Sequence, residues 1–358
     1  MPESYSISNR TINAIEPPYI IAEISGNHMG SLETAFELIK AAHSAGADAV
    51  KFQTYEAHTI TLDSDAEAFI VHENLWKGER LYNLYKKAQT PFAWHQALFA
   101  KAAEIGIPAF SAPFDATAVD LLQSLSCPAY KIASCELVDI PLLQKVAATN
   151  MPLILSTGMA TEAEVDEAIA TLKEAGADTI ALLHCISGYP TPHHEANLQT
   201  LPALRAKYNL PIGISDHSMG IAVPVAATAL GAVIIEKHLC LSRQSDAVDR
   251  AFSLEPHEFA DMVRACREAH SALGKVQIGP VASESDSLRF RRSLYITRNL
   301  KKGDVLDATA VRSVRPAGGL HTRYLKDVMG QKIRETVKAG TPLSWNLIEE
   351  AERVGTKE

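Results

Sequence analysis

The feature that most constrains the fold is an eightfold alternation of short apolar segments with longer segments of helical periodicity. Each apolar segment spans five or six residues and is rich in β-branched residues. This alternation is typical of βα units around a parallel sheet. Eight units within roughly 280 residues match the size of a (β/α)8 TIM barrel, an α/β fold. The predicted strands are residues 19–23, 49–53, 107–111, 129–133, 152–157, 179–184, 211–215 and 232–237.

Start and stop signals support the helices between these strands. Thr161, with Glu164 three residues later, forms a capping-box pattern ahead of VDEAIATLKEAG. Gly46, Gly106 and Gly176 stand where three helices should end before the next strand. The local signals therefore agree with the alternation.

Two regions depart from the repeat. Residues 55–91 are too long for an ordinary βα loop, and we expect helical or hairpin structure over the barrel mouth. After the barrel domain, residues 1–282, the polar segment 283–292 is predicted to be a linker. Residues 293–358 contain short β-like runs and the turns KKGD and KAGT, which predict a small β-rich domain. A module of about 60 residues buries little core alone and should lean on another surface.

Charge is unevenly distributed along the 358 residues, which carry 34 Lys+Arg against 42 Asp+Glu. From Glu284 onward there are 15 Lys+Arg and 10 Asp+Glu, so an acidic body carries a basic tail. The acidic body argues against nucleic-acid binding. The basic tail is explained either by chance and solubility, or by docking on the acidic body or on an anionic ligand.

Composition also excludes several other classes of protein. No run of about 18 apolar residues exists to cross a bilayer. The N-terminal segment has no basic region followed by an apolar one, so we expect a cytoplasmic protein. The cysteines are odd in number, widely spaced and without CxxC, which is typical of reduced thiols rather than a disulfide framework or zinc ribbon. They are Cys127, Cys135, Cys185, Cys240 and Cys266.

Polar residues gather at the predicted strand ends, where the active site of a TIM barrel lies. A single Lys or Ser there is usually solvated or caps a helix, but almost every strand end carries one. Such a concentration indicates a charged, hydrogen-bonding site. The residues are Glu23, Ser25, Asn27, His28, Lys51, Gln53, Lys131, Ser134, Glu136, Ser156, Thr157, Ser187, Tyr189, Ser215, Asp216, His217, Glu236, Lys237 and His238.

Two constellations stand out among them. Lys51 and Lys131 could both point at one anion, and the segment of Ser156, Thr157 and Gly158 precedes a predicted helix whose amides could help bind phosphate. His217 and His238 follow consecutive strands and could share a divalent metal, with water in the open positions. Two histidines are also compatible with ordinary core or hydrogen-bonding roles. A His-plus-oxygen shell would suit Mn²⁺, Mg²⁺ or Co²⁺.

The motifs at these positions resemble the sialic acid synthase family in order and spacing. They are AEISGNHMGS at Ala22, VKFQTY at Val50, YKIASCE at Tyr130, STGM at Ser156, ISDHSMG at Ile214, IEKH at Ile235 and FS at Phe252. The tail, with VRSVRPAGGL, is similar to the antifreeze-like (SAF) domain that ends those enzymes. TPFAWH at Thr90, SAPFDATAVD at Ser111 and LVDIPLL at Leu137 most resemble the branch of the family that makes pseudaminic acid.

The resemblance implies a transferase that condenses phosphoenolpyruvate with an N-acetylated amino sugar and water, giving a nine-carbon 2-keto acid and phosphate. For the pseudaminate branch the sugar is 2,4-diacetamido-2,4,6-trideoxy-L-altrose, and the alternatives are legionaminate or N-acetylneuraminate synthesis. A metal would polarise the sugar aldehyde, C3 of the enol would attack it, water would add at C2, and phosphate would leave by C–O cleavage. No covalent nucleophile is needed, so neither Cys135 nor Cys185 is assigned that role.

The resemblance also implies residue roles. Glu23 would act in catalysis as an electrostatic or proton-handling group, together with the metal ligands His217 and His238. Glu136, Asp249 and Arg315 would face the sugar, with Arg315 reaching the partner's barrel in a domain-swapped homodimer. Phosphoenolpyruvate would contact Lys51, Gln53, Lys131, Ser134, Ser156, Ser187, Tyr189 and Ser215.

Two positions depart from the family pattern. Ser187 stands where neuraminate synthases typically have Asn, which favours a different branch. Ala112 stands where the family usually has Thr or Ser, so one hydroxyl contact to phosphoenolpyruvate is absent or is replaced by Ser111 or water. Other hypotheses are a barrel synthase that uses a shorter sugar phosphate, which would need additional Arg or Lys at the mouth, and an ice- or carbohydrate-binding protein built around the tail.

Overall fold

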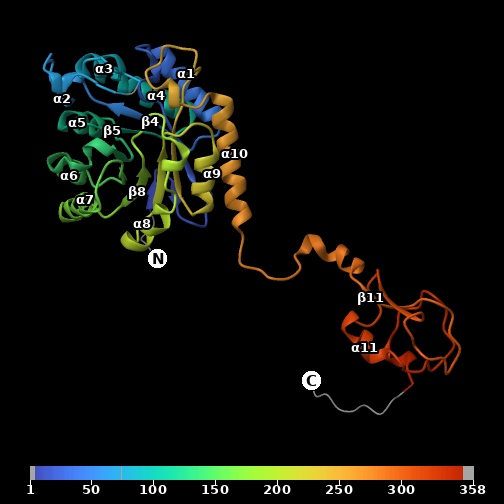
Figure 1. The fold of residues 1–358 in the computed structure, drawn as a ribbon. Helices are drawn as coiled ribbons and strands as arrows, with labels where there is room; N and C mark the ends of the chain where they lie inside the picture. Colours follow the sequence, from blue (N-terminus) through green and yellow to red (C-terminus); the bar gives the residue numbers. More distant parts are fainter. Residues whose placement is uncertain (1–4, 74, 350–358) are drawn as a thin grey trace. The chain divides into compact units, whose positions relative to one another are not determined.

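The chain forms two compact units, Met1–Gly274 and Lys275–Glu358 (Figure 1). The computed structural model describes residues 5–73 and 75–349. The barrel lies within the first unit.

The first unit is a closed barrel of parallel strands in the order β10-β3-β4-β5-β6-β7-β8-β9. Every predicted strand segment overlaps one of these strands, so the predicted TIM barrel is confirmed. The strands are β3 (Tyr19–Glu23), β4 (Ala49–Thr54), β5 (Ala109–Pro113), β6 (Tyr130–Ile132), β7 (Leu153–Ser156), β8 (Ile180–Cys185), β9 (Ile212–Asp216) and β10 (Ile234–His238).

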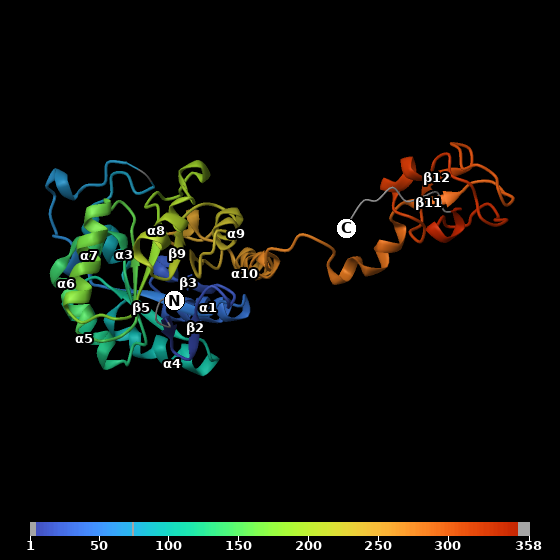
Figure 2. The ribbon, with the colours of Figure 1, turned by 90° about the horizontal axis from the view of Figure 1, so that it is seen from below.

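A longer helix follows each strand and packs outside the barrel (Figure 2). The predicted capping box is present, because Thr161 N donates to Glu164 Oε2 at 2.7 Å and Glu164 N donates to Thr161 Oγ1 at 3.3 Å. Among the described residues, no helix has both the length and the apolar character needed to cross a membrane. The outer helices are α1 (Leu32–Ser44), α4 (His95–Ile105), α5 (Ala116–Ser124), α6 (Ile140–Ala147), α7 (Glu162–Glu174), α8 (Thr200–Tyr208), α9 (Ala222–Ala229) and α10 (Pro256–Leu273).

Outside residues 55–91, short 3-10 helices occupy several loops of this unit, mostly where strands lead into helices. They are η1 (Ser25–His28), η3 (Phe92–Trp94), η4 (Ser134–Val138), η5 (His193–Glu195) and η6 (Arg250–Phe252).

The register of the barrel brings polar strand ends into one ring. Glu23 of β3 pairs with Lys51 of β4 on one side and with His238 of β10 on the other. Glu236 of β10 pairs with Ser215 of β9. Because side chains alternate along a strand, Glu236 and His238 point to the same side. The strand ends therefore converge at the carboxyl end of the barrel.

An N-terminal hairpin, β1 (Tyr5–Ile7) and β2 (Arg10–Ile12), was not predicted. Tyr5 is buried, and its hydroxyl donates to the carbonyl of Leu153, the first residue of β7, at 3.2 Å. This contact places the hairpin at the amino end of the barrel, away from the polar ring.

The long insert between β4 and α4 contains both kinds of structure that the sequence left open. It forms α2 (Ala57–Ile60), η2 (Glu67–Phe69) and α3 (Leu81–Ala88), with an antiparallel bridge from Ile70 to Arg80 between the last two. Figures 1 and 2 show this insert in light blue at one edge of the barrel.

The C-terminal unit has its own small apolar core, which includes Leu294, Leu306 and Leu343. Its two antiparallel strands are supplemented by single bridges such as Leu300 with Val337. The predicted linker 283–292 coincides largely with a 3-10 segment whose residues are exposed. The elements are η7 (Ala282–Phe290), β11 (Ser293–Ile296), β12 (Val311–Val314), η8 (Thr322–Tyr324), α11 (Leu325–Val328) and η9 (Trp345–Leu347).

Candidate active site

A cavity of about 490 Å³ opens at the carboxyl ends of the barrel strands. It brings together the residues predicted for the site, except Ser187 and Arg315. The residues that the prediction shares with the cavity lining are Glu23, Lys51, Gln53, Lys131, Ser134, Glu136, Ser156, Tyr189, Ser215, His217, His238 and Asp249.

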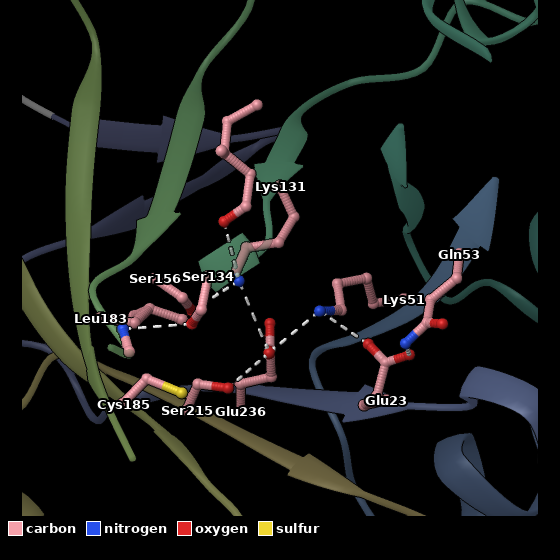
Figure 3. Close-up of polar contacts among 12 residues, drawn as sticks. Glu23, Lys51, Gln53, Lys131, Ser134, Ser156, Leu183, Cys185, Ser215 and Glu236 are labelled. Carbon is pink, nitrogen blue, oxygen red and sulfur yellow. Dashed lines mark hydrogen bonds and ion pairs between the residues drawn. The ribbon is translucent and has the colours of Figure 1, made fainter. Parts of the chain in front are cut away.

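Two buried lysines and two buried glutamates form the floor of this cavity (Figure 3). Lys51 Nζ lies 2.7 Å from Glu23 Oε2 and 2.9 Å from Glu236 Oε1. Lys131 Nζ lies 3.9 Å from the same Glu236 oxygen. Burial lowers the pKa of Lys51 to about 8, although the Glu236 charge opposes that shift. The two ammonium groups thus meet at one carboxylate, where a substrate anion could compete for them.

Hydroxyl groups complete this cluster. Lys131 Nζ donates to Ser156 Oγ at 2.6 Å, and Ser215 Oγ donates to Glu236 Oε1 at 2.8 Å. On the other side, Gln53 Nε2 donates to Glu23 Oε1 at 3.3 Å. The lysine, serine and glutamine side chains of this group were predicted to contact phosphoenolpyruvate. Each of them is therefore already hydrogen-bonded to a neighbouring side chain.

The predicted contribution of backbone amides before the helix is not present in this form. Thr157 N donates to the Leu183 carbonyl, Gly158 N donates to Ser134 Oγ at 3.1 Å, and α7 begins only at Glu162. These two amides are therefore already engaged within the protein, and Lys51 and Lys131 remain as the charged groups for an anion. Gly158 still has a steric role, because a Cβ there would overlap the hydroxyls of Ser134 and Ser187.

His217 and His238 lie side by side in the cavity, with ring centroids 5.2 Å apart. His217 Nδ1 lies 3.0 Å from the Ile186 carbonyl, which only accepts hydrogen bonds, so Nδ1 carries a proton. Burial acts to lower the pKa of His217, but the neighbouring Cys185 sulfur outweighs it and raises that pKa, so a cation at Nε2 would displace a proton there. His238 Nδ1 is buried with no hydrogen-bond partner in the described chain. Burial, reinforced by the neighbouring His217, lowers the pKa of His238 well below its usual value, so that ring is neutral.

These two rings fit a metal site with open positions. The nearest carboxylate contact is long, since Asp249 Oδ2 lies 3.9 Å from His238 Nδ1. Within residues 5–73 and 75–349, no group of three or more His, Cys, Asp or Glu side chains is arranged to hold a metal. Any cation here would take its remaining ligands from water or substrate.

The residues predicted to face the sugar are divided between the units. Burial raises the pKa of Glu136 to about 7. Asp249 accepts a hydrogen bond from the Ser25 hydroxyl, and its amide donates to Asn27 Oδ1 at 3.1 Å. Arg315 is an exposed residue of the C-terminal unit, so its role at the site stays a prediction.

Ser111 does not replace the hydroxyl missing at Ala112. Its Oγ lies 2.6 Å from Thr54 Oγ1, which also contacts His95 of α4. Neighbouring residues on a strand point to opposite sides, so Ser111 faces the outer helices and does not line the cavity.

Two parts of the site were missed in the sequence. Glu236 was noted as a polar strand end within IEKH but was given no role, although it contacts Lys51, Lys131 and Ser215. Glu236 lies two residues before His238 on β10, so the two side chains share a face of the strand, and this spacing was the available signal. The aromatic and aliphatic wall of the cavity, which includes Trp76 and Leu84, gave no such signal.

A second ion pair lies behind the strands, on the side of the outer helices. Lys237 Nζ is fully buried and lies 2.5 Å from Asp216 Oδ2. Asp216 Oδ1 accepts from Ser218 N at 2.9 Å, and Lys237 also donates to the Ser218 carbonyl. The pair therefore fixes the turn that carries His217.

All five cysteines are free, and only Cys135 is exposed. Cys135 and Cys185 both line the cavity. Cys185 Sγ lies 3.9 Å from His217 Nδ1.

Comparison with known proteins finds close relatives over nearly the whole chain. The sequence matches the NeuB family over residues 38–278 and the SAF domain over residues 291–349. It is 41% identical over 337 residues to the pseudaminic acid synthase of Helicobacter pylori, which covers 94% of this chain and 99% of that protein. It is 42% identical over 331 residues to the pseudaminic acid synthase of Campylobacter jejuni serotype O:2, with coverage of 92% and 96%.

A solved structure also matches. The N-acetylneuraminic acid synthetase of Leptospira borgpetersenii, determined with citrate, is 33% identical and superposes with a TM-score of 0.72. The match covers 80% of this chain and 96% of that chain.

Proposed function

Because the chain belongs to the NeuB family and ends in a SAF domain, we propose that it condenses phosphoenolpyruvate with 2,4-diacetamido-2,4,6-trideoxy-L-altrose and water. The products are pseudaminate and phosphate. The observation that supports this chemistry best is the buried cluster of Lys51, Lys131 and Glu236 next to the paired rings of His217 and His238. Its relatives of 41% and 42% identity support the choice of sugar.

In this proposal the two lysines bind the phosphate and carboxylate of phosphoenolpyruvate. Ser156, which accepts from Lys131, and Ser134 orient the bound anion. C3 of phosphoenolpyruvate then forms a bond to the aldehyde carbon of the open-chain sugar. Water adds at C2, the bond from C2 to the phosphate oxygen breaks, and phosphate leaves. Glu23, paired with Lys51, stabilises charge or handles a proton during these steps.

His217 and His238 would hold a divalent cation, Mn²⁺, Mg²⁺ or Co²⁺. Their nitrogens suit this role because the Ile186 carbonyl engages His217 Nδ1 and leaves Nε2 for a cation, and because His238 is neutral. When bound, the cation would supply a Lewis acid for the sugar aldehyde. Glu136 and Asp249 would bind polar groups of the sugar.

We further propose that the functional unit is a domain-swapped homodimer in which Arg315 completes the sugar site of the partner. Two exposed apolar regions support it. Val276, Ile278 and Phe290 expose apolar side chains in the segment between barrel and SAF domain. Met29 and Met159 do so on loops that follow barrel strands. In the swapped arrangement a second copy would cover these side chains.

A panel of sugars tests the proposed function. Purified protein is incubated with phosphoenolpyruvate and either the diacetamido-trideoxy altrose, its legionaminate-type counterpart or N-acetylmannosamine. Phosphate release and product mass are measured. We expect release only with a sugar present, and greatest efficiency with the altrose. Comparable efficiency with N-acetylmannosamine would place the enzyme in the neuraminate branch, and no release with any sugar would reject a synthase.

The alternative barrel synthase acting on a sugar phosphate is disfavoured by the cavity itself. Among its described lining residues, Lys51 and Lys131 are the lysines, and no arginine is present. Both lysines are already needed for phosphoenolpyruvate, so the described lining of this cavity offers no further lysine or arginine for a second phosphate.

A further inference from the structure

One side of the cavity is apolar and comes from the insert rather than from the barrel strands. The strands provide the charged floor described above. The insert provides Ile60, Val71, Trp76, Leu81, Leu84 and Tyr85, of which only the two aromatic residues carry a hydrogen-bonding atom in the side chain. We call these six residues the insert wall.

Several contacts join the parts of the insert to one another. The backbone of Arg80 forms the antiparallel bridge with Ile70. Its side chain forms two ion pairs, with Nη2 2.5 Å from Asp63 Oδ1 and Nε 2.9 Å from Asp65 Oδ1. Ala57 N donates to Gln89 Oε1 at 2.9 Å, which ties the start of the insert to its end. The insert wall therefore presents a defined surface to a ligand.

The insert wall is also continuous with the proposed reaction centre. The Trp76 ring lies 6.0 Å from Tyr189 and 6.4 Å from Phe252, measured between ring centroids. The Phe252 ring in turn lies 4.9 Å from His238 and 5.9 Å from His217. A sugar whose aldehyde lies at the two histidines would therefore extend along the insert wall.

We propose that the insert wall determines sugar specificity by contacting the apolar substituents of the sugar, the C6 methyl group and the acetamido methyl groups. This inference rests on the proposed function and assigns its selectivity to particular residues. A hydroxyl held against the insert wall would lose its hydrogen bonds to water without replacement. An apolar pocket rejects such a group by up to about a hundredfold. The enzyme thus selects 6-deoxy sugars through the insert, while the strands bind phosphoenolpyruvate.

Two sugars that differ only at C6 test the proposal, 2,4-diacetamido-2,4,6-trideoxy-L-altrose and its 6-hydroxy counterpart. The measured quantity is the ratio of kcat/KM for the two sugars. For the wild type we expect this ratio to favour the 6-deoxy sugar by about tenfold to a hundredfold. In Val71→Thr and Leu81→Asn, a polar group on the insert wall should lower the ratio by about tenfold. The KM for phosphoenolpyruvate should stay within about twofold, since its lysines are unchanged.

Val225→Thr is the matched control. Val225 is half-buried like Val71 but lies on α9, outside the cavity. For Val225→Thr, the ratio of kcat/KM for the two sugars should equal that of the wild type. If the wild type turns over both sugars and neither insert variant changes the ratio more than Val225→Thr does, the inference is wrong while the proposed function stands. If the wild type releases no phosphate with either sugar, both fail.

Discussion

Lys51 is buried between two carboxylates, and its pKa decides over which pH range the anion site keeps both charges. Burial lowers that pKa to about 8. We therefore expect the KM for phosphoenolpyruvate to rise as pH increases through about 8, approaching tenfold per pH unit once the lysine is mostly neutral. Steady-state kinetics between about pH 7 and pH 10 measure this change in KM. Lys51→Arg should bind phosphoenolpyruvate less well than the wild type. Its KM should not depend on pH in this way, because arginine stays charged. A flat wild-type profile would contradict the assignment.

His217 should be required for metal binding as well as for turnover. Removing its imidazole leaves His238 as the single nitrogen ligand among the predicted pair. We therefore expect His217→Ala to bind Mn²⁺ at least about tenfold more weakly than the wild type. Electron paramagnetic resonance of free Mn²⁺ measures this affinity directly. His194→Ala, at an exposed histidine, serves as the control. Chelation should abolish wild-type activity, and Mn²⁺ or Co²⁺ should restore it. Full activity in excess chelator would exclude a required metal.

The ion pair of Lys237 and Asp216 should show strong coupling between its members. Lys237→Met leaves a buried carboxylate without its counter-charge, which costs about 3–5 kcal/mol in the free energy of unfolding. The double variant with Asp216→Asn removes both charges and should recover most of that loss. Urea denaturation of the wild type, each single variant and the double variant gives the coupling. Additive losses would show that the two side chains act independently.

The alternation of side chains explains which site residues could be predicted. Lys51, Ser215 and His238 were found because a TIM barrel places polar strand ends together. The partners of these residues could not be predicted, because a hydrogen bond across the barrel depends on register and side-chain conformation. Glu236 therefore seemed an ordinary strand end, and Gly158 seemed to offer a free amide that Ser134 in fact occupies.

At the level of elements, the capping box of α7 provides a local test. Thr161 accepts from Glu164 N, and the Glu164 carboxylate accepts from Thr161 N. Thr161→Ala removes the cap and should lower the free energy of unfolding by about 1 kcal/mol. Thr161→Ser keeps a hydroxyl and should retain most of the stability that the cap contributes. Chemical denaturation measures both variants. Equal stability of Thr161→Ala and wild type would show that tertiary packing alone determines this helix start.

Elements with a long, repeated pattern could be predicted, and elements without one could not. Each barrel strand is buried on both faces and so appears as an apolar run. The strands of the N-terminal hairpin have three residues each, too few to show a period. Its position depends on Tyr5 reaching Leu153, a contact 148 residues away in the chain. The insert was recognised by length alone, and its contribution to the cavity came from tertiary structure.

At the scale of the whole molecule, the second unit combines a basic charge with exposed apolar residues. Residues from Glu284 onward carry 15 Lys+Arg against 10 Asp+Glu, whereas the whole chain has a net charge of −8. Val276 and Ile278, at the start of this unit, are fully exposed. The basic charge favours docking of this unit on an acidic surface, and the apolar side chains favour burial against a partner. The proposed swapped dimer supplies such a surface.

Mixing two inactive variants tests whether Arg315 acts in the partner's site. Arg315→Ala and His217→Ala are combined in equal amounts under conditions that exchange subunits. If Arg315 acts in trans, each mixed dimer has one site with both lesions and one intact site. Random exchange makes half of the dimers mixed, so phosphate release should return to about a quarter of the wild-type rate. If Arg315 serves its own barrel, every site in a mixed dimer carries one lesion, and the rate should stay at the level of the unmixed variants. Native mass spectrometry of the mixture confirms that exchange has occurred, so an absence of recovery in exchanged dimers would reject the swapped site.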